Sequence, residues 1–241
     1  MTRVSPPPSL MEPPTNAERG QVAFDAAVAQ RVEELLEAQR VLPAQRSLDT
    51  RLRASRLPER ERAECCLEAV RYEGGTRGFD AISLARLADC AWVQKGEPLV
   101  ITGDTGRGKT WLACAFANEA LRRGYKVRYD RVPELLRTSW KKVLGEVDDW
   151  EKWHKSLDTA DVWVLDDWGA QPLAPEDVVS LRNLLIGRLS RRKRSAMIVA
   201  SPLALPAQWE QWLGGQYMAK SIVDRLIHGP CPLSLGGPSL R

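Results

Sequence analysis

The chain has 241 residues, a formal net charge of +4 at pH 7 and a hydrophobic content of 44%. This length suffices for one substantial α/β core with a smaller appendage. The sequence holds no apolar run long enough to cross a bilayer and no apolar signal core near its N-terminus, so we expect neither a membrane protein nor a secreted one. The small positive charge is weak evidence for a nucleic-acid partner on its own.

The cysteine and histidine content narrows the possible chemistry. The five cysteines stand at irregular positions without zinc-type spacing, and their odd number argues against a disulfide framework. We therefore expect reduced thiols and a cytoplasmic protein. Only two histidines occur, His154 and His228, which argues against a histidine-based metal site or acid–base pair.

The N-terminal part differs in composition from the rest of the chain. Residues 1–20 contain five prolines and few apolar side chains, so we expect a disordered tail. Residues 21–64 are expected to form a helical N-terminal segment, because apolar residues recur there at helical spacing until Pro43 interrupts the run. Such a segment buries little alone and should dock on the core or on a partner. Residues 65–241 then form the main domain.

From about residue 76, strand and helix patterns alternate, which indicates an α/β fold with a central parallel sheet flanked by helices. The expected strands are 98–102, 126–129, 162–165, 196–200 and about 231–235. One helix marked by Ile82, Leu84, Leu87 and Trp92 should precede the first strand; the others are expected at 110–123, from Pro133 onward, 149–157, 175–190, 205–213 and 216–227.

Residues 103–110 carry the most specific motif, Gly-Asp-Thr-Gly-Arg-Gly-Lys-Thr, directly after an apolar run. Its glycines let successive N–H groups turn inward around a polyphosphate, and the helix that follows points its positive end at the same anion. Lys109 can reach the β- and γ-phosphates, and Thr110 can offer its hydroxyl to Mg²⁺. The alternative is a glycine-rich turn with a solvated lysine. We predict a P-loop NTPase whose nucleotide-binding residues are Gly103, Asp104, Thr105, Gly106, Arg107, Gly108, Lys109, Thr110 and Trp111.

Two carboxylates follow the apolar strand 162–165, at the sheet edge where ligands bind in open α/β sheets. Asp166 is expected to hold Mg²⁺ through its water shell, and Asp167 to act as base or orienting group for the attacking water. ATPases of this kind more often carry glutamate at the second position, and aspartate is shorter by one methylene. We therefore expect slow hydrolysis unless a partner improves the geometry; the alternative is a turn that merely begins with two aspartates.

Two further polar residues are candidates for the same site. Ser201 follows the strand 196–200, where a hydroxyl can contact the γ-phosphate or its water; the alternative is an ordinary turn before Pro202. Arg225 lies on an expected helix and can project into a neighbouring subunit's nucleotide as a finger supplied in trans. The alternative is a surface arginine paired with a nearby acid.

Four stretches outline a resemblance over about residues 65–241: Leu99–Gly124 around the phosphate loop, Tyr125–Leu136 with Val-Arg-Tyr-Asp-Arg-Val-Pro, Val164–Leu173 with Leu-Asp-Asp-Trp-Gly-Ala-Gln-Pro-Leu, and Ile222–His228 with Ile-Val-Asp-Arg-Leu-Ile-His. Together they resemble the IstB-like ATP-binding proteins, the AAA+ helper ATPases of insertion-sequence transposition, and the related DnaC/DnaI helicase loaders. The Asp-Asp-Trp-Gly and Asp-Arg-Leu-Ile-His sequences make this specific, since they are not general P-loop features.

The resemblance implies an AAA+ ATPase of the initiator and loader group, without a separate C-terminal lid. It gives ATP and Mg²⁺ as cofactors, Asp166 to the metal, Asp167 to catalysis, Ser201 to the sensor position and Arg225 to the finger. Family members assemble as helical oligomers on duplex DNA, bend it and recruit or activate a transposase. This chain departs from the family's Ser-Gln-Leu-Pro after the sensor strand, and again at residues 215–220, both near the presumed subunit interface.

DNA contacts are expected on the helix from Pro133, where Arg137, Lys141 and Lys142 are spaced so that at least two share one face. The alternative is a solvated helix face. The basic run Arg191–Arg194 is more typical of a solvated loop.

Three other functions stay open beside the transposition ATPase. One is a helicase loader, and another is an ATP-gated adaptor with negligible hydrolysis, which Asp167 keeps open. A small-molecule kinase is disfavoured, because no acceptor-binding or lid arginines stand out after 175–190.

Overall fold

The computed structural model describes residues 30–31, 45–70, 78–143, 147–190, 195–204, 206–215, 217–229, 232–237 and 239, without the side chains of 138–143, 147–151 and 153. The chain divides into two units, Met1–Ser47 and Leu48–Arg241. The predicted tail 1–20, residues 21–29 and 32–44 of the predicted helical segment, and the basic run Arg191–Arg194 lie outside the described residues. The second unit carries the predicted main domain.

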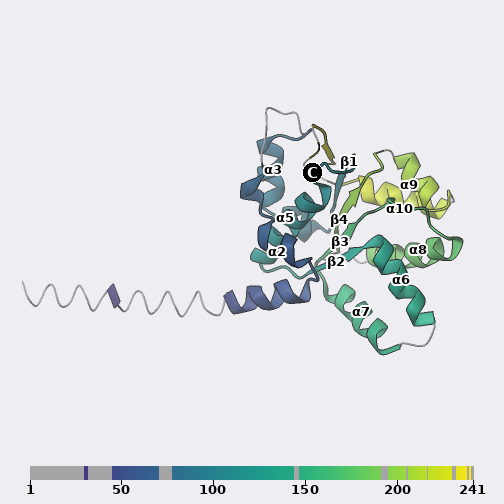
Figure 1. The fold of residues 1–241 in the computed structure, drawn as a ribbon, viewed down its shortest axis with the longest axis horizontal. Coiled ribbons are helices and arrows are strands. Elements are labelled where there is room, and N and C mark those ends of the chain that lie inside the picture. Colours follow the sequence, from purple (N-terminus) through teal and green to yellow (C-terminus); the bar gives the residue numbers. More distant parts are fainter. Residues whose placement is uncertain are drawn as a thin grey trace, which may run out of the picture. The chain divides into compact units, whose positions relative to one another are not determined.

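The described part of the second unit contains a five-stranded sheet with the order β2-β3-β4-β1-β5 (Figure 1). Every pairing is parallel, and Leu99 of β1 and Val164 of β3 both lie beside Ile198 of β4. The strands are β1 (Pro98–Gly103), β2 (Val127–Arg131), β3 (Val162–Asp166), β4 (Ala196–Ser201) and β5 (Leu233–Leu235). This confirms the predicted α/β fold, and it brings the carboxyl ends of the strands to one edge.

One face of the sheet is covered by α2 (Glu59–Glu64), η1 (Leu67–Ala69), α3 (Ala81–Ala88), α4 (Ala91–Lys95) and α5 (Lys109–Arg122). In Figure 1, α2, α3 and α5 lie together on this side. Helix α5 is the centre of the layer, since most of its length from Leu112 to Leu121 is buried. Its apolar residues pack with every second residue of the strands, such as Leu99 and Ile198.

The opposite face is covered by α6 (Val132–Val143), α7 (Val147–Thr159), α8 (Pro175–Leu189), α9 (Pro206–Trp212) and α10 (Tyr217–Ile227). The alternate strand residues, such as Val100, Trp163 and Val199, pack against them in a second hydrophobic cluster. The two apolar faces explain why the strands are nearly continuous hydrophobic runs. Among the described residues, no helix combines the length and hydropathy that a bilayer crossing demands.

One sequence expectation about the helices is wrong. The single helix expected before the first strand is two short helices, α3 and α4. Asp89 ends the first, and Cys90 adopts a left-handed backbone with φ of 58° before the second begins. The turn lets Trp92 point its indole N–H back to the carbonyl of Leu87 at 3.0 Å, so a buried tryptophan fixes the break.

The buried guanidinium of Arg188 links helix α8 to the end of α7 and to the starts of two strands. Only 2% of Arg188 is exposed. Its terminal nitrogens donate to the carbonyls of Leu157, Ala160, Asp161 and Ala196 at 2.8–3.2 Å. Burial lowers the pKa of Arg188 to about 10. One side chain of α8 thus ties the end of α7 to the starts of β3 and β4.

Candidate nucleotide-binding site

The phosphate loop connects β1 to α5 and owes its shape to three glycines. Gly103, Gly106 and Gly108 have φ of 141°, 85° and 86°, a range that side chains with a Cβ resist. A Cβ on Gly103 would also lie 2.5 Å from the carbonyl oxygen of Leu235 in β5. The loop therefore fits tightly against the edge strand, and Gly108 leads directly into the N-terminus of α5.

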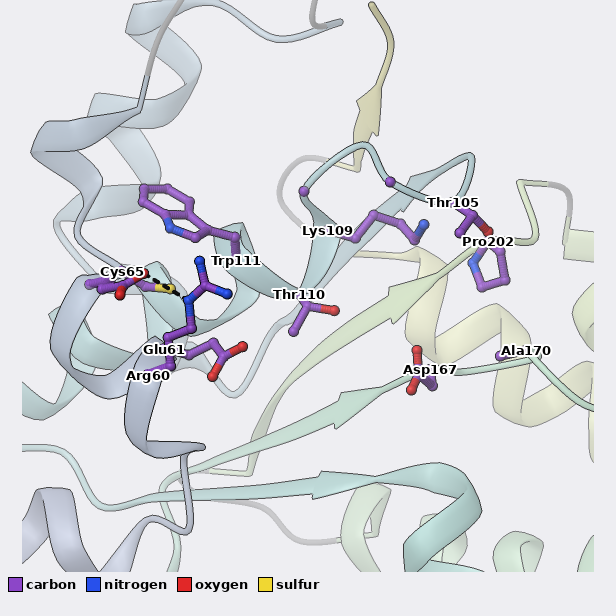
Figure 2. Close-up of a pocket in the computed structure, with 13 residues that line it drawn as sticks. Arg60, Glu61, Cys65, Thr105, Lys109, Thr110, Trp111, Asp167, Ala170 and Pro202 are labelled. Atoms are coloured by element: carbon purple, nitrogen blue, oxygen red, sulfur yellow. Dashed lines mark hydrogen bonds and ion pairs between the residues drawn. The ribbon is translucent and has the colours of Figure 1, made fainter. Parts of the chain in front are cut away.

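A pocket of about 400 Å³ opens beside this loop. Thr105, Gly106, Gly108, Lys109 and Thr110 form its phosphate-loop side, with Asp167, Ala170 and Pro202 across from them. Its other end is formed by Trp111 and by a segment from α2 onward: Arg60, Glu61, Glu64 and Cys65. Figure 2 shows these two groups on either side of Thr110.

The predicted nucleotide-binding residues do not all meet this pocket. Thr105, Gly106, Gly108, Lys109, Thr110 and Trp111 line it. Asp104 and Arg107 instead pair with each other across the loop, Nη2 to Oδ2 at 3.4 Å. The Lys109 ammonium donates to the carbonyl of Asp104 at 2.8 Å, so its charge lies over the loop. Together with the positive end of α5, it favours a polyphosphate at this position.

Asp166 lies at the end of β3, only 2% exposed, and each of its oxygens accepts a hydrogen bond. The Thr110 hydroxyl donates to Oδ1 at 3.1 Å, and the Tyr129 hydroxyl donates to Oδ2 at 2.8 Å. Burial raises the pKa of Asp166, while these two hydrogen bonds lower it. The Tyr129 hydroxyl, buried beside this carboxyl, has its own pKa raised by burial.

The adjacent hydroxyl and carboxylate oxygens of Thr110 and Asp166 fit Mg²⁺, which prefers oxygen ligands. The described residues contain no cluster of three or more His, Cys, Asp or Glu side chains that could hold a metal ion alone. Such a sparse donor set suits a cation that keeps several waters and shares nucleotide phosphates. Thr110 and Asp166 are therefore the residues that could hold it.

Asp167 lines the pocket with an unusual backbone and a charged partner. Its φ is 56°, and its N–H donates to Oδ1 of Asp166 at 2.9 Å. Its carboxylate pairs with Arg131 at the end of β2, with Nε to Oδ2 at 2.9 Å. The same guanidinium lies 3.5 Å from Glu134 in α6. The candidate catalytic carboxylate is thus tied to α6 through one arginine.

The remaining predicted site residues lie outside this pocket. Ser201 is fully buried; its hydroxyl donates to the carbonyl of Trp168 at 2.8 Å and accepts from the N–H of Leu203 at 3.0 Å. Arg225 is exposed on α10. Arg137 is exposed on α6 and contributes to a second hollow of about 240 Å³ on the far side of Asp167. The backbone of Lys141 and Lys142 belongs to α6, and their side chains are outside the description.

Three contributions to the site were not found in the sequence. Tyr129 and Arg131 reach the carboxylates from β2, and the segment 60–65 closes the pocket. Tyr129 and Arg131 could have been found from their spacing, because residues two apart lie on the same face of a strand. This strand pairs with the one that carries the carboxylates, and Arg131 lies beside Asp166. Residues 60–65 carry no comparable signal, since Arg-Glu-Arg-Ala-Glu-Cys is a typical solvated helix.

Several solved structures share this fold. The DnaC helicase loader matches with a TM-score of 0.59 at 18% identity, over 74% of this chain and 99% of that one. DnaI matches with a TM-score of 0.57 at 24% identity, over 77% and 95% of the two chains. AMPPCP-bound DnaA from Aquifex aeolicus gives 0.52 at 20% identity, over 72% of this chain and 50% of that one. These similarities show that the chain shares the fold of DnaC, DnaI and DnaA.

Sequence relatives are closer. The putative insertion sequence ATP-binding protein y4pL of Sinorhizobium fredii is 34% identical over 197 residues, which cover 81% of this chain and 76% of that protein. The insertion sequence IS21 putative ATP-binding protein of Pseudomonas aeruginosa is 29% identical, over 82% and 70% of the two chains. Residues 14–241 match the family described as IstB-like ATP binding protein. The chain belongs to the IstB-like ATP-binding protein family.

Proposed function

We propose that this protein is an ATPase that binds ATP with Mg²⁺, oligomerises on duplex DNA and recruits or activates a transposase. The observation that carries the proposal is one pocket lined by Lys109, Thr110 and Asp167, in which Thr110 also bonds Asp166 at the end of β3. Relatives named as insertion sequence ATP-binding proteins support the link to transposition. A cytoplasmic location belongs to the same proposal.

The site residues divide the work of phosphate binding and hydrolysis. Lys109 and the loop N–H groups hold the β- and γ-phosphates, and Asp167 faces the position of the attacking water. Mg²⁺, held through Thr110 and Asp166, would neutralise charge on the phosphates. Arg225, exposed on α10, is assigned to the nucleotide of a neighbouring copy. Arg137, Lys141 and Lys142 on α6 are assigned to the DNA backbone.

If Ser201 acts as the sensor, it acts indirectly, through the turn that its hydrogen bonds stabilise. Its hydroxyl is engaged by Trp168 and Leu203, so it acts on the position of Pro202 and Ala170 at the pocket wall and not on the phosphate directly. The role of this residue is then to couple β4 to the turn after Asp167.

A second candidate function is an ATP-gated adaptor with negligible turnover. The ion pair between Arg131 and Asp167 favours it, because a carboxylate oxygen that already accepts from a guanidinium is less free to bind a water molecule. In that case ATP binding alone would drive assembly, and the release of phosphate would add nothing to it.

Electron microscopy of negatively stained protein with duplex DNA tests the proposal. We expect rings or spirals that enclose DNA with ATP and Mg²⁺, and none without nucleotide. The Lys109→Ala variant is the control and should fail to assemble under either condition. Monomers in every condition would contradict the remodelling mechanism and leave an adaptor that assembles only on its protein partner.

A further inference from the structure

The end of the pocket away from the phosphate loop is formed by a segment that has little support of its own. Helix α2 is six residues long, none of them is buried, and no side chain caps its N-terminus. Arg60, Glu61 and Glu64 nevertheless line the pocket from this helix. Something outside α2 must therefore hold these side chains in place, because so short a helix is unstable alone.

Asn118 of α5 supplies that support. It is 4% exposed. Its side-chain amide donates to the carbonyl of Cys65 at 2.8 Å and to that of Glu61 at 3.2 Å, and lies 3.5 Å from that of Arg62. These carbonyls lie at the C-terminal end of α2, where a helix runs short of backbone donors; that of Glu61 also accepts the N–H of Cys65. The amide therefore fixes the end of α2 against α5. The residues that flank α2 in the chain, Leu57 and Cys65, are themselves buried.

The same helix holds both ends of the pocket. Thr110 lies in the first turn of α5, and Asn118 lies eight positions later on the helix Lys109–Arg122. At about 1.5 Å per residue, the two side chains are separated by roughly 12 Å along the axis. This spacing is comparable to that between the phosphates and the base of a nucleoside triphosphate. Helix α5 thus sets the distance from the phosphate-binding residues to the segment at the other end.

We propose that Asn118 is a positioning residue for the nucleoside end of the bound nucleotide, which makes affinity depend on the base and ribose and not on the phosphates alone. The proposal rests on the nucleotide binding proposed above. The polar groups of Arg60, Glu61 and Glu64 beside the indole of Trp111 suit a heterocyclic base with an exocyclic amine. The phosphate loop binds the other end without help from Asn118.

The test compares MgATP with magnesium tripolyphosphate, which has the phosphates and lacks the nucleoside, by titration calorimetry. Asn118→Leu has similar volume and no donor, so the carbonyls of Glu61, Arg62 and Cys65 lose the amide that ties them to α5. We expect its Kd for MgATP to rise about tenfold or more and its Kd for tripolyphosphate to stay at the wild-type value. Asn118→Ser keeps one donor and should fall between the two. Lys109→Ala is the matched control on the same helix and should lose both ligands.

A measurement on the unaltered protein covers the case in which Asn118→Leu does not fold. Hydrogen exchange of the Cys65 amide, which donates to the carbonyl of Glu61, should slow with MgATP and not with tripolyphosphate. Equal loss of both ligands in the Asn118 variants would overturn the proposal, since the residue would then merely support α5. Unchanged MgATP affinity would overturn it too. If the wild-type protein binds tripolyphosphate and MgATP equally, the role of Asn118 is contradicted and the proposed function is not. If it binds neither, the proposed function itself is contradicted.

Discussion

Asp167 is constrained at both its backbone and its side chain. The left-handed φ of 56° is rare outside glycine, asparagine and aspartate. Arg131 then holds the carboxylate from the neighbouring strand. The two constraints fix the oxygen atoms toward the pocket without the extra methylene of a glutamate. In the proposed ATPase, hydrolysis therefore depends on whether the carboxylate can leave Arg131 and meet a water molecule.

We predict that Asp167→Asn abolishes turnover and spares binding. Asparagine adopts the same left-handed backbone, so the change removes the charge and little else. Phosphate release should fall by about 100-fold or more, while MgATP affinity and assembly on DNA stay at wild-type level. A phosphate-release assay and microscopy of the same sample measure the two. Asp80→Asn, which keeps a helix cap on α3, is the matched control. A variant that still releases phosphate normally would remove Asp167 from the mechanism.

Among the elements, α8 depends on one buried cation, Arg188, whose hydrogen bonds in the described part of the chain go to backbone carbonyls. Arg188 donates to four carbonyls, at the end of α7, just before β3 and at the start of β4; those of Leu157 and Asp161 also accept a backbone N–H. The lowered pKa, about 10, shows that burial acts against the charge. The stability gained from the four hydrogen bonds must exceed this cost.

Replacing Arg188 by methionine should destabilise the fold. The change removes the buried charge but takes one donor from each of four carbonyls, and a buried carbonyl left without any donor costs about 1–3 kcal/mol, which the lost desolvation penalty offsets only in part. We expect the free energy of unfolding to drop by about 2–4 kcal/mol in urea titration. Arg182→Met, at another buried arginine of the same helix, shows how much of the effect belongs to these carbonyls. Equal stability of Arg188→Met and the wild type would contradict the assignment.

The elements that the sequence predicts well are those that repeat a local pattern. Each strand lies within about two residues of its prediction because buried parallel strands are continuous apolar runs. The break at Cys90 was missed because it depends on the contact of Trp92 with Leu87, which the period of the helix does not encode. Tyr129 and Arg131 were missed for a related reason: their partners are set by the order of strands, which spacing along the chain does not give.

On the scale of the whole molecule, the proposed ATPase needs more than one copy. Arg225 is exposed on α10 and is absent from the residues that line the pocket. If the arginine acts on the nucleotide of a neighbouring copy, one variant can lack the arginine while another lacks the nucleotide site. This allows an activity to be rebuilt from two inactive chains.

We predict that Lys109→Ala and Arg225→Ala complement each other. The first cannot bind ATP, and the second binds it but supplies no finger, so each alone should lose about 1,000-fold in DNA-stimulated hydrolysis. In an equal mixture, the intact Arg225 of one chain meets ATP on the other, and a measurable share of activity should return. Activity no greater than the sum of the separate chains would place Arg225 outside the site.

The residues just before α2 have a consequence for how the protein can be shortened. Residues 45–54 are helical, Arg51 donates to the carbonyl of Leu121 at 3.2 Å, and the carbonyl of Ser55 accepts from the N–H of Tyr129 at 2.8 Å. Ser55 therefore covers part of the outer side of β2, the edge strand of the sheet. An open strand edge is a template for pairing with another chain. A version that begins at residue 65 should precipitate, whereas one that begins at residue 45 should stay dispersed in light scattering.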